Sequence, residues 1–179
     1  MVYLFLVDGY EDTEMIAPLD MLSRADIPVT RVGVTGKTVT SKLGIPMPAD
    51  IMADELNLSD CEMIFLPGGP GTKNYFGQSV IDRAIAYCTE NDRYMAAICA
   101  APSVLSAKGV LRGKKAVCHF SVNEKMDCAQ LMHQPVCVDG KVITGQGAAA
   151  SIDFGLALVA ALRGEQAAQK VKHGICYPE

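Results

Sequence analysis

Short apolar runs alternate along the chain with longer segments in which apolar residues share one face. The continuous runs 2–7, 63–66 and 95–98 predict strands that are buried on both sides, as in a parallel sheet. The segment 80–88 has the spacing of a helix with one buried face, and 148–162 predicts a long apolar helix. Because strands alternate with helices, we expect an α/β fold, in which a doubly wound, mostly parallel, flavodoxin-like sheet is sandwiched by helices.

Turn signals divide the rest of the chain into shorter elements. Asp8-Gly9 ends the first strand, and the helix that follows accommodates Pro18 only near its first turn or at a kink. Asp139-Gly140 is a strong hairpin signal between two short apolar runs. The other expected elements are a strand at 27–34, a small hairpin at 37–48, a brief strand at 116–118 and a last helix at 165–172.

Length, charge and composition narrow the class of protein. The 179 residues are enough for a single domain, 1–179, with its own core. The formal charge of −4, without a basic block, argues against nucleic acid as a partner. No apolar run approaches the roughly 20 residues that a membrane span needs, so no membrane partner is expected. The amino terminus lacks the positive region of a signal peptide, and we therefore expect a cytoplasmic protein.

The seven cysteines are expected to be reduced thiols. Their number is odd, no Cys-x-x-Cys pair occurs, and a chain of this size does not depend on disulfides for its core. Cys128, His133 and Cys137 are candidate metal ligands, but their spacing matches no zinc pattern. We therefore expect no metal site and regard most of the thiols as small hydrophobic side chains.

Cys99 lies at the junction between the strand 95–98 and a helix that begins near Pro102. This junction places the thiol at the carboxyl edge of the sheet, where α/β folds bind ligands. It also directs the amino end of the helix at the sulfur, which favours the thiolate. Small neighbours, Ala97 and Ala100 among them, permit the tight turn of a nucleophile elbow. The alternative is a buried and inert cysteine, the commonest state of a free thiol.

Two glycine-containing loops also follow strands and are expected at the same edge of the sheet. Gly68 and Gly69 follow the strand 63–66, and the amides of Gly69 and Ala100 together suit an oxyanion hole. The alternative is a sharp turn that only needs a positive φ. Gly145 and Gln146 open the second loop and are expected to line the same pocket as Gly68.

A carboxylate and an imidazole complete the set of candidates. Glu14 is either a solvated residue of the first helical turn or a pocket acid with a raised pKa that hydrogen-bonds Cys99 when protonated. His119 follows the strand 116–118, where it is either structural or a general base and orienting partner for Cys99.

Together these residues resemble the ThiJ/PfpI superfamily, and within it the branch around the Parkinson-associated protein DJ-one. The order and spacing of the elements agree with that branch from Met1 to about Lys172. The motifs that carry the resemblance are Gly9-Tyr-Glu-Asp-Thr-Glu-Met-Ile-Ala-Pro-Leu-Asp20, Phe65-Leu-Pro-Gly-Gly69, Ala96-Ala-Ile-Cys-Ala-Ala-Pro102 and, more weakly, His119 with Asn123-Glu-Lys-Met126.

The resemblance implies a role for each of the converging residues. Cys99 would be the reactive nucleophile, Glu14 its protonated hydrogen-bonding partner and His119 the nearby histidine, while Gly69 and Ala100 would supply backbone donors. It also implies a homodimer that needs no cofactor. The activities implied are a glyoxalase that converts methylglyoxal to lactate, or a deglycase of glycated thiols and amines. The substrate would thus be a small carbonyl compound or a glycated adduct.

Two other functions remain open. A non-enzymatic redox sensor or stress chaperone would use the oxidation of Cys99 to change partner binding. An amidase or peptidase is disfavoured, because Phe120 follows His119 and no triad acid stands beside the histidine as in protease-like members.

Overall fold

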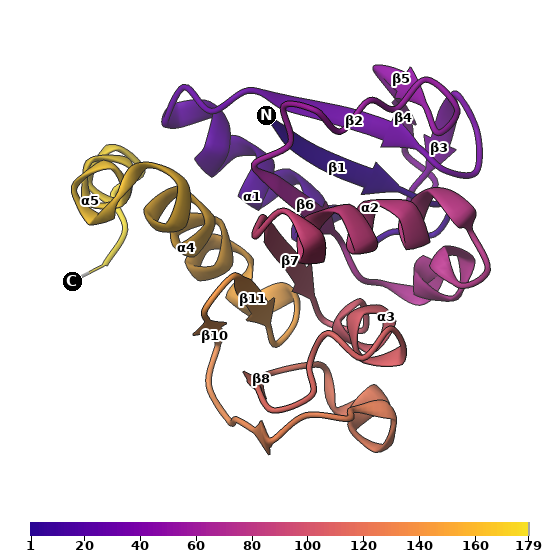
Figure 1. The fold of residues 1–179 in the computed structure, drawn as a ribbon. Helices are drawn as coiled ribbons and strands as arrows, with labels where there is room; N and C mark the ends of the chain where they lie inside the picture. Colours follow the sequence, from indigo (N-terminus) through magenta and orange to yellow (C-terminus); the bar gives the residue numbers. More distant parts are fainter. Residues whose placement is uncertain (179) are drawn as a thin grey trace.

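A seven-stranded sheet forms the centre of the computed structural model, which describes residues 1–178. Its strand order is β10-β11-β7-β6-β1-β2-β5, and every neighbouring pair is parallel except β10 with β11 (Figure 1). The predicted fold class is confirmed. The strands are β1 (Val2–Leu6), β2 (Val29–Gly33), β5 (Ile51–Met52), β6 (Met63–Leu66), β7 (Tyr94–Ile98), β10 (Val136–Asp139) and β11 (Val142–Gly145).

Helices cover both faces of this sheet. On one side lie α1 (Asp12–Arg24), α4 (Ser151–Arg163) and α5 (Glu165–Gly174), and on the other α2 (Ser79–Glu90) and α3 (Pro102–Ala107). Successive strand side chains point to opposite faces, so Leu4 packs with the first set and Phe5 with the second. Both are completely buried, which explains why the sequence of β1 is apolar throughout rather than alternating.

Both predicted hairpins are present. β3 (Thr38–Thr40) pairs with β4 (Pro46–Pro48) in a separate two-stranded antiparallel sheet, and β10 turns into β11 at Asp139-Gly140. Short 3₁₀ helices complete the fold: η1 (Pro70–Tyr75), η2 (Phe120–Lys125) and η3 (Ala148–Ala150).

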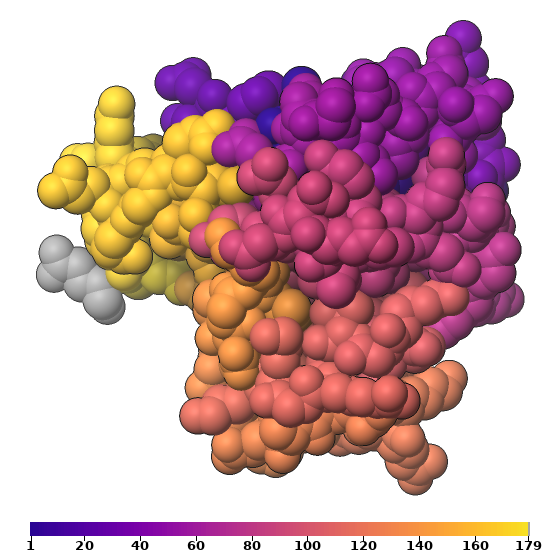
Figure 2. Space-filling model, viewed as in Figure 1, coloured from indigo at the N-terminus to yellow at the C-terminus, as the bar shows by residue number. Residues whose placement is uncertain are grey.

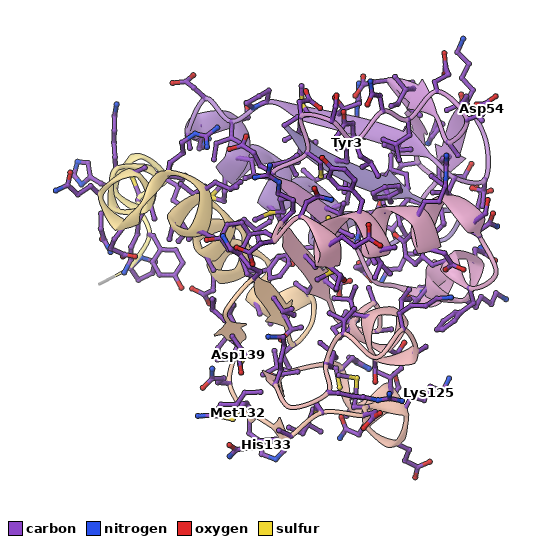
Figure 3. The ribbon with its side chains drawn as sticks, viewed as in Figure 1. Tyr3, Asp54, Lys125, Met132, His133 and Asp139 are labelled. Carbon is purple, nitrogen blue, oxygen red and sulfur yellow. The ribbon has the colours of Figure 1, made fainter. Side chains whose placement is uncertain are left out.

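The brief strand predicted at 116–118 is wrong in extent and in place. β8 covers only Lys115–Ala116 and pairs with β9 (Gln130–Leu131), outside the central sheet. The amide of Val117 instead donates to Oγ1 of Thr144 in β11, 2.9 Å away, which ends strand pairing there. The segment with β8 and β9 forms one end of the molecule in Figure 2, and Met132 and His133 are labelled at this end in Figure 3.

Pro18 lies in the middle of α1, beyond the first turn, which was one of the two positions expected for it, the other being a kink. A helical proline removes one backbone donor, so packing must offset the loss. A Cβ at Gly155 of α4 would lie 2.9 Å from the Cα of Pro18 and 2.7 Å from Cγ of Met21. The close approach of α1 and α4 at this glycine buries Pro18 and stabilises the helix around it.

No helix among residues 1–178 is long and apolar enough to span a bilayer. All seven cysteines are free thiols, as the sequence predicted.

Candidate active site

Cys99 occupies the sharp turn between β7 and α3. Its φ is +64°, a left-handed conformation that costs a residue with a Cβ about 1–2 kcal/mol. Two backbone hydrogen bonds hold it there: its amide donates to the carbonyl of Gly145 at 2.9 Å, and its carbonyl accepts from the amide of His119 at 2.8 Å. The side chain is half-buried. The neighbouring segments thus impose the strained geometry of a nucleophile elbow on this cysteine.

The carboxyl group of Glu14 meets Cys99 above Gly68. Glu14 lies in the first turn of α1 and is only 1 % exposed, so it is a pocket acid rather than a solvated one. Its Oε2 accepts a hydrogen bond from the amide of Gly68 at 3.1 Å. A Cβ at position 68 would lie 2.6 Å from the Cβ of Cys99 and 2.6 Å from Oε2 of Glu14. Only glycine therefore allows the three segments to come together.

Burial determines the electrostatics of the pair. It raises the pKa of Glu14 to about 7, against the opposing hydrogen bonds from Cys99 and from the Gly68 amide. The pKa of the Cys99 thiol is also raised, to about 12, first by burial and then by the charge and hydrogen bond of Glu14. The expectation that the site as a whole favours the thiolate is therefore wrong, although the Ala100 amide at the start of the helix does act in that direction. The reason is that burial of the thiol and the charge of Glu14 outweigh the backbone donors.

Two backbone amides act in the opposite direction. Those of Gly69 and Ala100 hydrogen-bond the Cys99 sulfur and lower its pKa. Gly69 has a φ of +97°, and a Cβ there would lie 2.5 Å from the amide nitrogen of Glu11, so this position requires glycine. The amides form a pair of donors beside the sulfur, the geometry that a developing negative charge needs.

His119 reaches the site through its backbone, while its ring is held from the other side. Nδ1 of the ring lies 2.8 Å from Oγ of Ser121 and accepts a hydrogen bond from the amide of Ser121 at 3.3 Å. Because Nδ1 is an acceptor, the neutral ring carries its proton on Nε2. The ring also stacks on Phe120, with centroids 4.1 Å apart. Among residues 1–178 no hydrogen bond joins this ring to Cys99 or Glu14.

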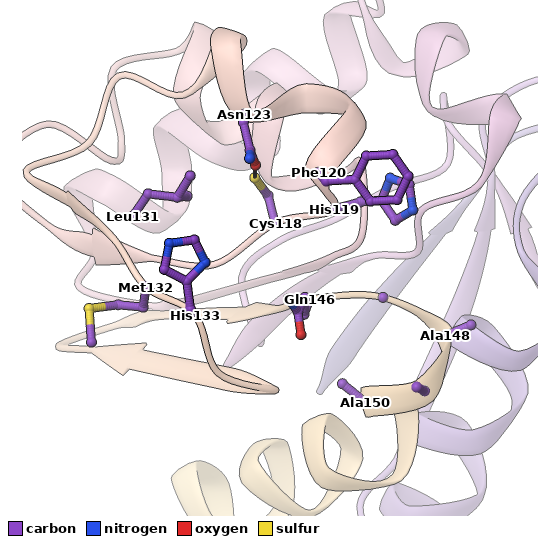
Figure 4. A pocket seen from close by; sticks show the side chains of 12 residues that line it. Cys118, His119, Phe120, Asn123, Leu131, Met132, His133, Gln146, Ala148 and Ala150 are labelled. Atoms are coloured by element: carbon purple, nitrogen blue, oxygen red, sulfur yellow. Dashed lines mark hydrogen bonds between the residues drawn. The ribbon is translucent and has the colours of Figure 1, made fainter.

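A cavity of about 370 Å³ opens beside His119 (Figure 4). Gln146 is exposed and lines this cavity with His119 and His133, while Cys99 and Glu14 are not among its lining residues. Gly145 is buried as the last residue of β11, where its carbonyl holds the Cys99 amide. Gln146 and Gly68, expected to line one pocket, thus belong to the His119 cavity and to the Cys99–Glu14 contact respectively.

Two charged residues near Glu14 were missed from the sequence. Glu11 forms an ion pair with Lys42, whose backbone amide donates to the carbonyl of Tyr10 at 2.9 Å. The charge of Glu11 raises the pKa of Glu14, and that of Lys42 lowers it. Glu11 is the N-cap residue of α1 and stands three positions before Glu14, and this spacing is a usable signal. Lys42 comes from the β3–β4 hairpin, and no local pattern connects it to α1.

A metal centre has no support in this arrangement. Within residues 1–178, no three histidine, cysteine or acidic side chains are grouped so that they could hold a metal ion. Cys128, His133 and Cys137, considered as ligands from the sequence, therefore do not form such a group.

Comparisons with known proteins identify the family of the chain. The model of the DJ-1/PfpI family matches residues 1–161. Protein DJ-1 homolog B of Arabidopsis thaliana is 32 % identical over 165 residues, covering 90 % of this chain and 37 % of that protein. The chain thus spans well under half the length of this Arabidopsis relative.

Other relatives are similar in length. The protein named glutathione-independent glyoxalase DJR-1.2, of Caenorhabditis elegans, is 26 % identical over 168 residues, which cover 93 % of this chain and 90 % of that protein. The crystal structure of Drosophila melanogaster DJ-1beta superposes with a TM-score of 0.94 at 27 % identity, covering 99 % of this chain and 98 % of the other.

Proposed function

Because this chain belongs to the DJ-1/PfpI family, we propose that it is a cysteine-dependent glyoxalase that converts methylglyoxal to lactate without a cofactor. The name of the C. elegans relative supports this choice of reaction. The observation that carries the proposal is the contact of the buried Glu14 carboxyl with Cys99 above Gly68. A titratable acid with a pKa near 7 beside a nucleophile suits proton transfer at neutral pH.

The first step is addition of the thiol to the aldehyde. The Cys99 sulfur forms a bond to the aldehyde carbon while its proton passes to Glu14, which is the nearest base. The amides of Gly69 and Ala100 stabilise the negative charge that develops on the oxygen. Glu14 then returns the proton to that oxygen, and the product is a neutral hemithioacetal.

The second step is an internal redox exchange between the two carbons. A base removes the hydrogen from the carbon bonded to sulfur, and a proton is returned to the former ketone carbon. The first carbon is thereby oxidised to a thioester and the second reduced to an alcohol. Glu14 and the Nε2 side of His119 are the residues proposed to move these protons. Water then hydrolyses the thioester, which releases lactate and restores the Cys99 thiol.

Substitution of the nucleophile tests the proposal. Cys99→Ser should abolish lactate formation from methylglyoxal, and Glu14→Gln should lower it by at least about 100-fold, the usual share of a general acid–base group. Cys137→Ser removes another buried thiol and serves as the matched control with unchanged activity. Unchanged turnover in Cys99→Ser would refute the proposal.

Glycated adducts are a second substrate class for the same machinery. Hemithioacetals and aminocarbinols formed by methylglyoxal with thiols and amines carry the same two-carbon unit, so attack by Cys99 would release the free thiol or amine. Release of lactate together with free cysteine from a preformed adduct, faster than the adduct decays in buffer, would support deglycation. A rate set by free methylglyoxal alone would limit the activity to the glyoxalase reaction.

Oxidation of Cys99 is the competing function. The amides of Gly69 and Ala100 beside a half-buried sulfur would also hold the oxygens of a sulfinate. Mass spectrometry after mild peroxide treatment tests it. Modification first at Cys99 would support a redox sensor, whereas modification only at the other thiols would exclude it.

We also propose that the protein forms a homodimer through α1. Ile16 and Ile152 are exposed, by 47 % and 39 %, and border a hollow of about 1040 Å³ between α1 and the chain end. Asp12 in the same hollow is buried, and its carboxylate oxygens have no hydrogen-bond partner within residues 1–178. Light scattering should give twice the chain mass for the wild type and the single mass for Ile16→Glu. A monomeric wild type at micromolar concentration would contradict this proposal.

A further inference from the structure

Two cysteines that play no part in the proposed chemistry face each other inside the protein. Cys61 is separated from the start of β6 by one residue, and Cys88 lies in the last turn of α2. Each is only 1 % exposed, and both belong to the apolar core between α2 and the sheet. Their thiols form a hydrogen bond with each other. Both are free in the structure.

Backbone hydrogen bonds fix the two segments that carry this pair. The amide of Arg93 donates to the carbonyl of Cys88 at 2.9 Å, and the next amide, Tyr94, donates to the carbonyl of Glu62 at 3.0 Å. Cys61 is bonded through its own amide to the carbonyl of Leu58 at 2.9 Å. The pair therefore lies at the amino end of β6 and β7, whereas Cys99 lies at their carboxyl end.

The surroundings distinguish the two sulfurs. The hydrogen bond from Cys88 is the largest influence on Cys61 and lowers its pKa, assisted by the amino terminus and the Met63 amide. The pKa of Cys88 is raised, because it keeps the proton that it shares with Cys61 and because it is buried. The amino terminus is held nearby by its ion pair with Glu62, at 2.7 Å. Cys61 is thus the better nucleophile of the two, and Cys88 the partner thiol.

A route from solvent reaches the pair on the Cys88 side. Cys88 lines a cavity of about 570 Å³ together with Asp92, Arg93 and Lys141. Tyr3, labelled in Figure 3, belongs to the same apolar core as Cys61, and its hydroxyl donates to the carboxylate of the neighbouring Asp60 at 2.8 Å. Since both thiols are only 1 % exposed, a small peroxide would have to reach the pair from this cavity, past Cys88.

We propose that Cys61 and Cys88 form a second redox site, a dithiol that hydroperoxides convert to a disulfide. The Cys61 sulfur attacks the peroxide, the O–O bond breaks, and the products are a sulfenic acid and one water or alcohol. The Cys88 sulfur then displaces the sulfenic oxygen as water, and the S–S bond forms. Overall the two thiols lose two electrons and two protons, which reduce the peroxide.

Peptide mapping of the full chain tests the proposal. The protein is treated with graded hydrogen peroxide, alkylated, digested without reduction and analysed by mass spectrometry. The expected product is a linked peptide pair containing Cys61 and Cys88, lighter by two hydrogens than the two thiols. It should form equally in the wild type, in Cys99→Ser and in the control Cys137→Ser. It should be absent from Cys61→Ser and Cys88→Ser.

Thermal unfolding provides a second readout that does not depend on those variants. A disulfide across this loop of 27 residues should raise Tm by roughly 5–10 °C, and dithiothreitol should reverse the shift. Complete alkylation of both thiols after unfolding of peroxide-treated wild type would overturn the proposal, as would separate sulfinic acids. Peptide mapping also looks for the linked product in Cys99→Ser, which should have no glyoxalase activity. The result of this test therefore does not depend on the glyoxalase proposal.

Discussion

Replacement of Glu14 by glutamine should change how the stability of the protein depends on pH. The substitution keeps the shape of the side chain and its acceptor for the Gly68 amide, but removes the titrating proton. In the folded protein, burial holds the pKa of Glu14 near 7, whereas an unfolded chain has the usual value of 4.5. The folded state therefore holds a proton that the unfolded state has lost between these two values.

The size and sign of the effect follow from linkage. Each unit of pKa difference corresponds to about 1.4 kcal/mol, so Glu14 is worth about 3 kcal/mol of stability. Because the folded pKa is raised, this contribution is fully present below pH 4.5. It is lost as the pH rises through about 7. The wild type should therefore lose about 3 kcal/mol of its free energy of unfolding between pH 4.5 and pH 8 through Glu14, whereas Glu14→Gln should not lose this contribution.

Urea denaturation at a series of pH values measures this difference. Both proteins are prepared in the Cys99→Ser background, so that the titration of the thiol does not contribute. Glu124→Gln makes the same chemical change at an exposed position and should give a difference that does not vary with pH. A difference between Glu14→Gln and its parent that stays equally flat would show that Glu14 is not protonated in the folded protein, and would refute the reasoning.

Two further substitutions test the geometry around the sulfur. Gly68→Ala places a methyl group 2.6 Å from both the Cys99 Cβ and Oε2 of Glu14. It should therefore lower the free energy of unfolding by about 1–3 kcal/mol and lower lactate formation at least tenfold. Gly174→Ala, where an added methyl group meets no other atom within 4 Å, is the control for both measurements. Cys99→Gly should be more stable than Cys99→Ala by about 0.5–1 kcal/mol in urea denaturation, because only glycine adopts a φ of +64° without strain. Equal stabilities would mean that the turn at Cys99 is not strained.

The apolar pattern was sufficient to predict the sheet and most helices. A run such as 63–66 is compatible with little besides a strand covered on both faces, and Asp139-Gly140 specifies its hairpin locally. The apolar pattern predicted the wrong structure where a residue distant in the sequence takes over a hydrogen bond or a packing contact. At Val117 the hydroxyl of Thr144 takes the amide that a longer strand would have used. At Pro18 the packing against Gly155 offsets the backbone hydrogen bond that a proline removes from the middle of a helix.

The same distinction applies to the site. The junction after β7 and the glycines after β6 were visible in the sequence, because tight turns need particular residues at particular positions. The direction of the Cys99 pKa shift was not visible in the sequence. The local helix favours a thiolate, whereas burial and the charge of Glu14 oppose it and raise the pKa. Glu14 lies 85 positions away in the sequence, and its burial is a property of the assembled fold.

One proton shared by the buried Glu14 carboxyl and the half-buried Cys99 thiol explains how these opposing influences can still serve catalysis. An ionised Glu14 keeps Cys99 a thiol, but a protonated Glu14 no longer repels the sulfur and can donate a hydrogen bond to it. The two protonation states differ only in the position of that proton. A substrate that attracts electrons from the sulfur would therefore draw the proton onto Glu14 as the new bond forms. The nucleophile is protected from ionisation until a carbonyl compound is present, which suits an enzyme better than a permanently exposed thiolate.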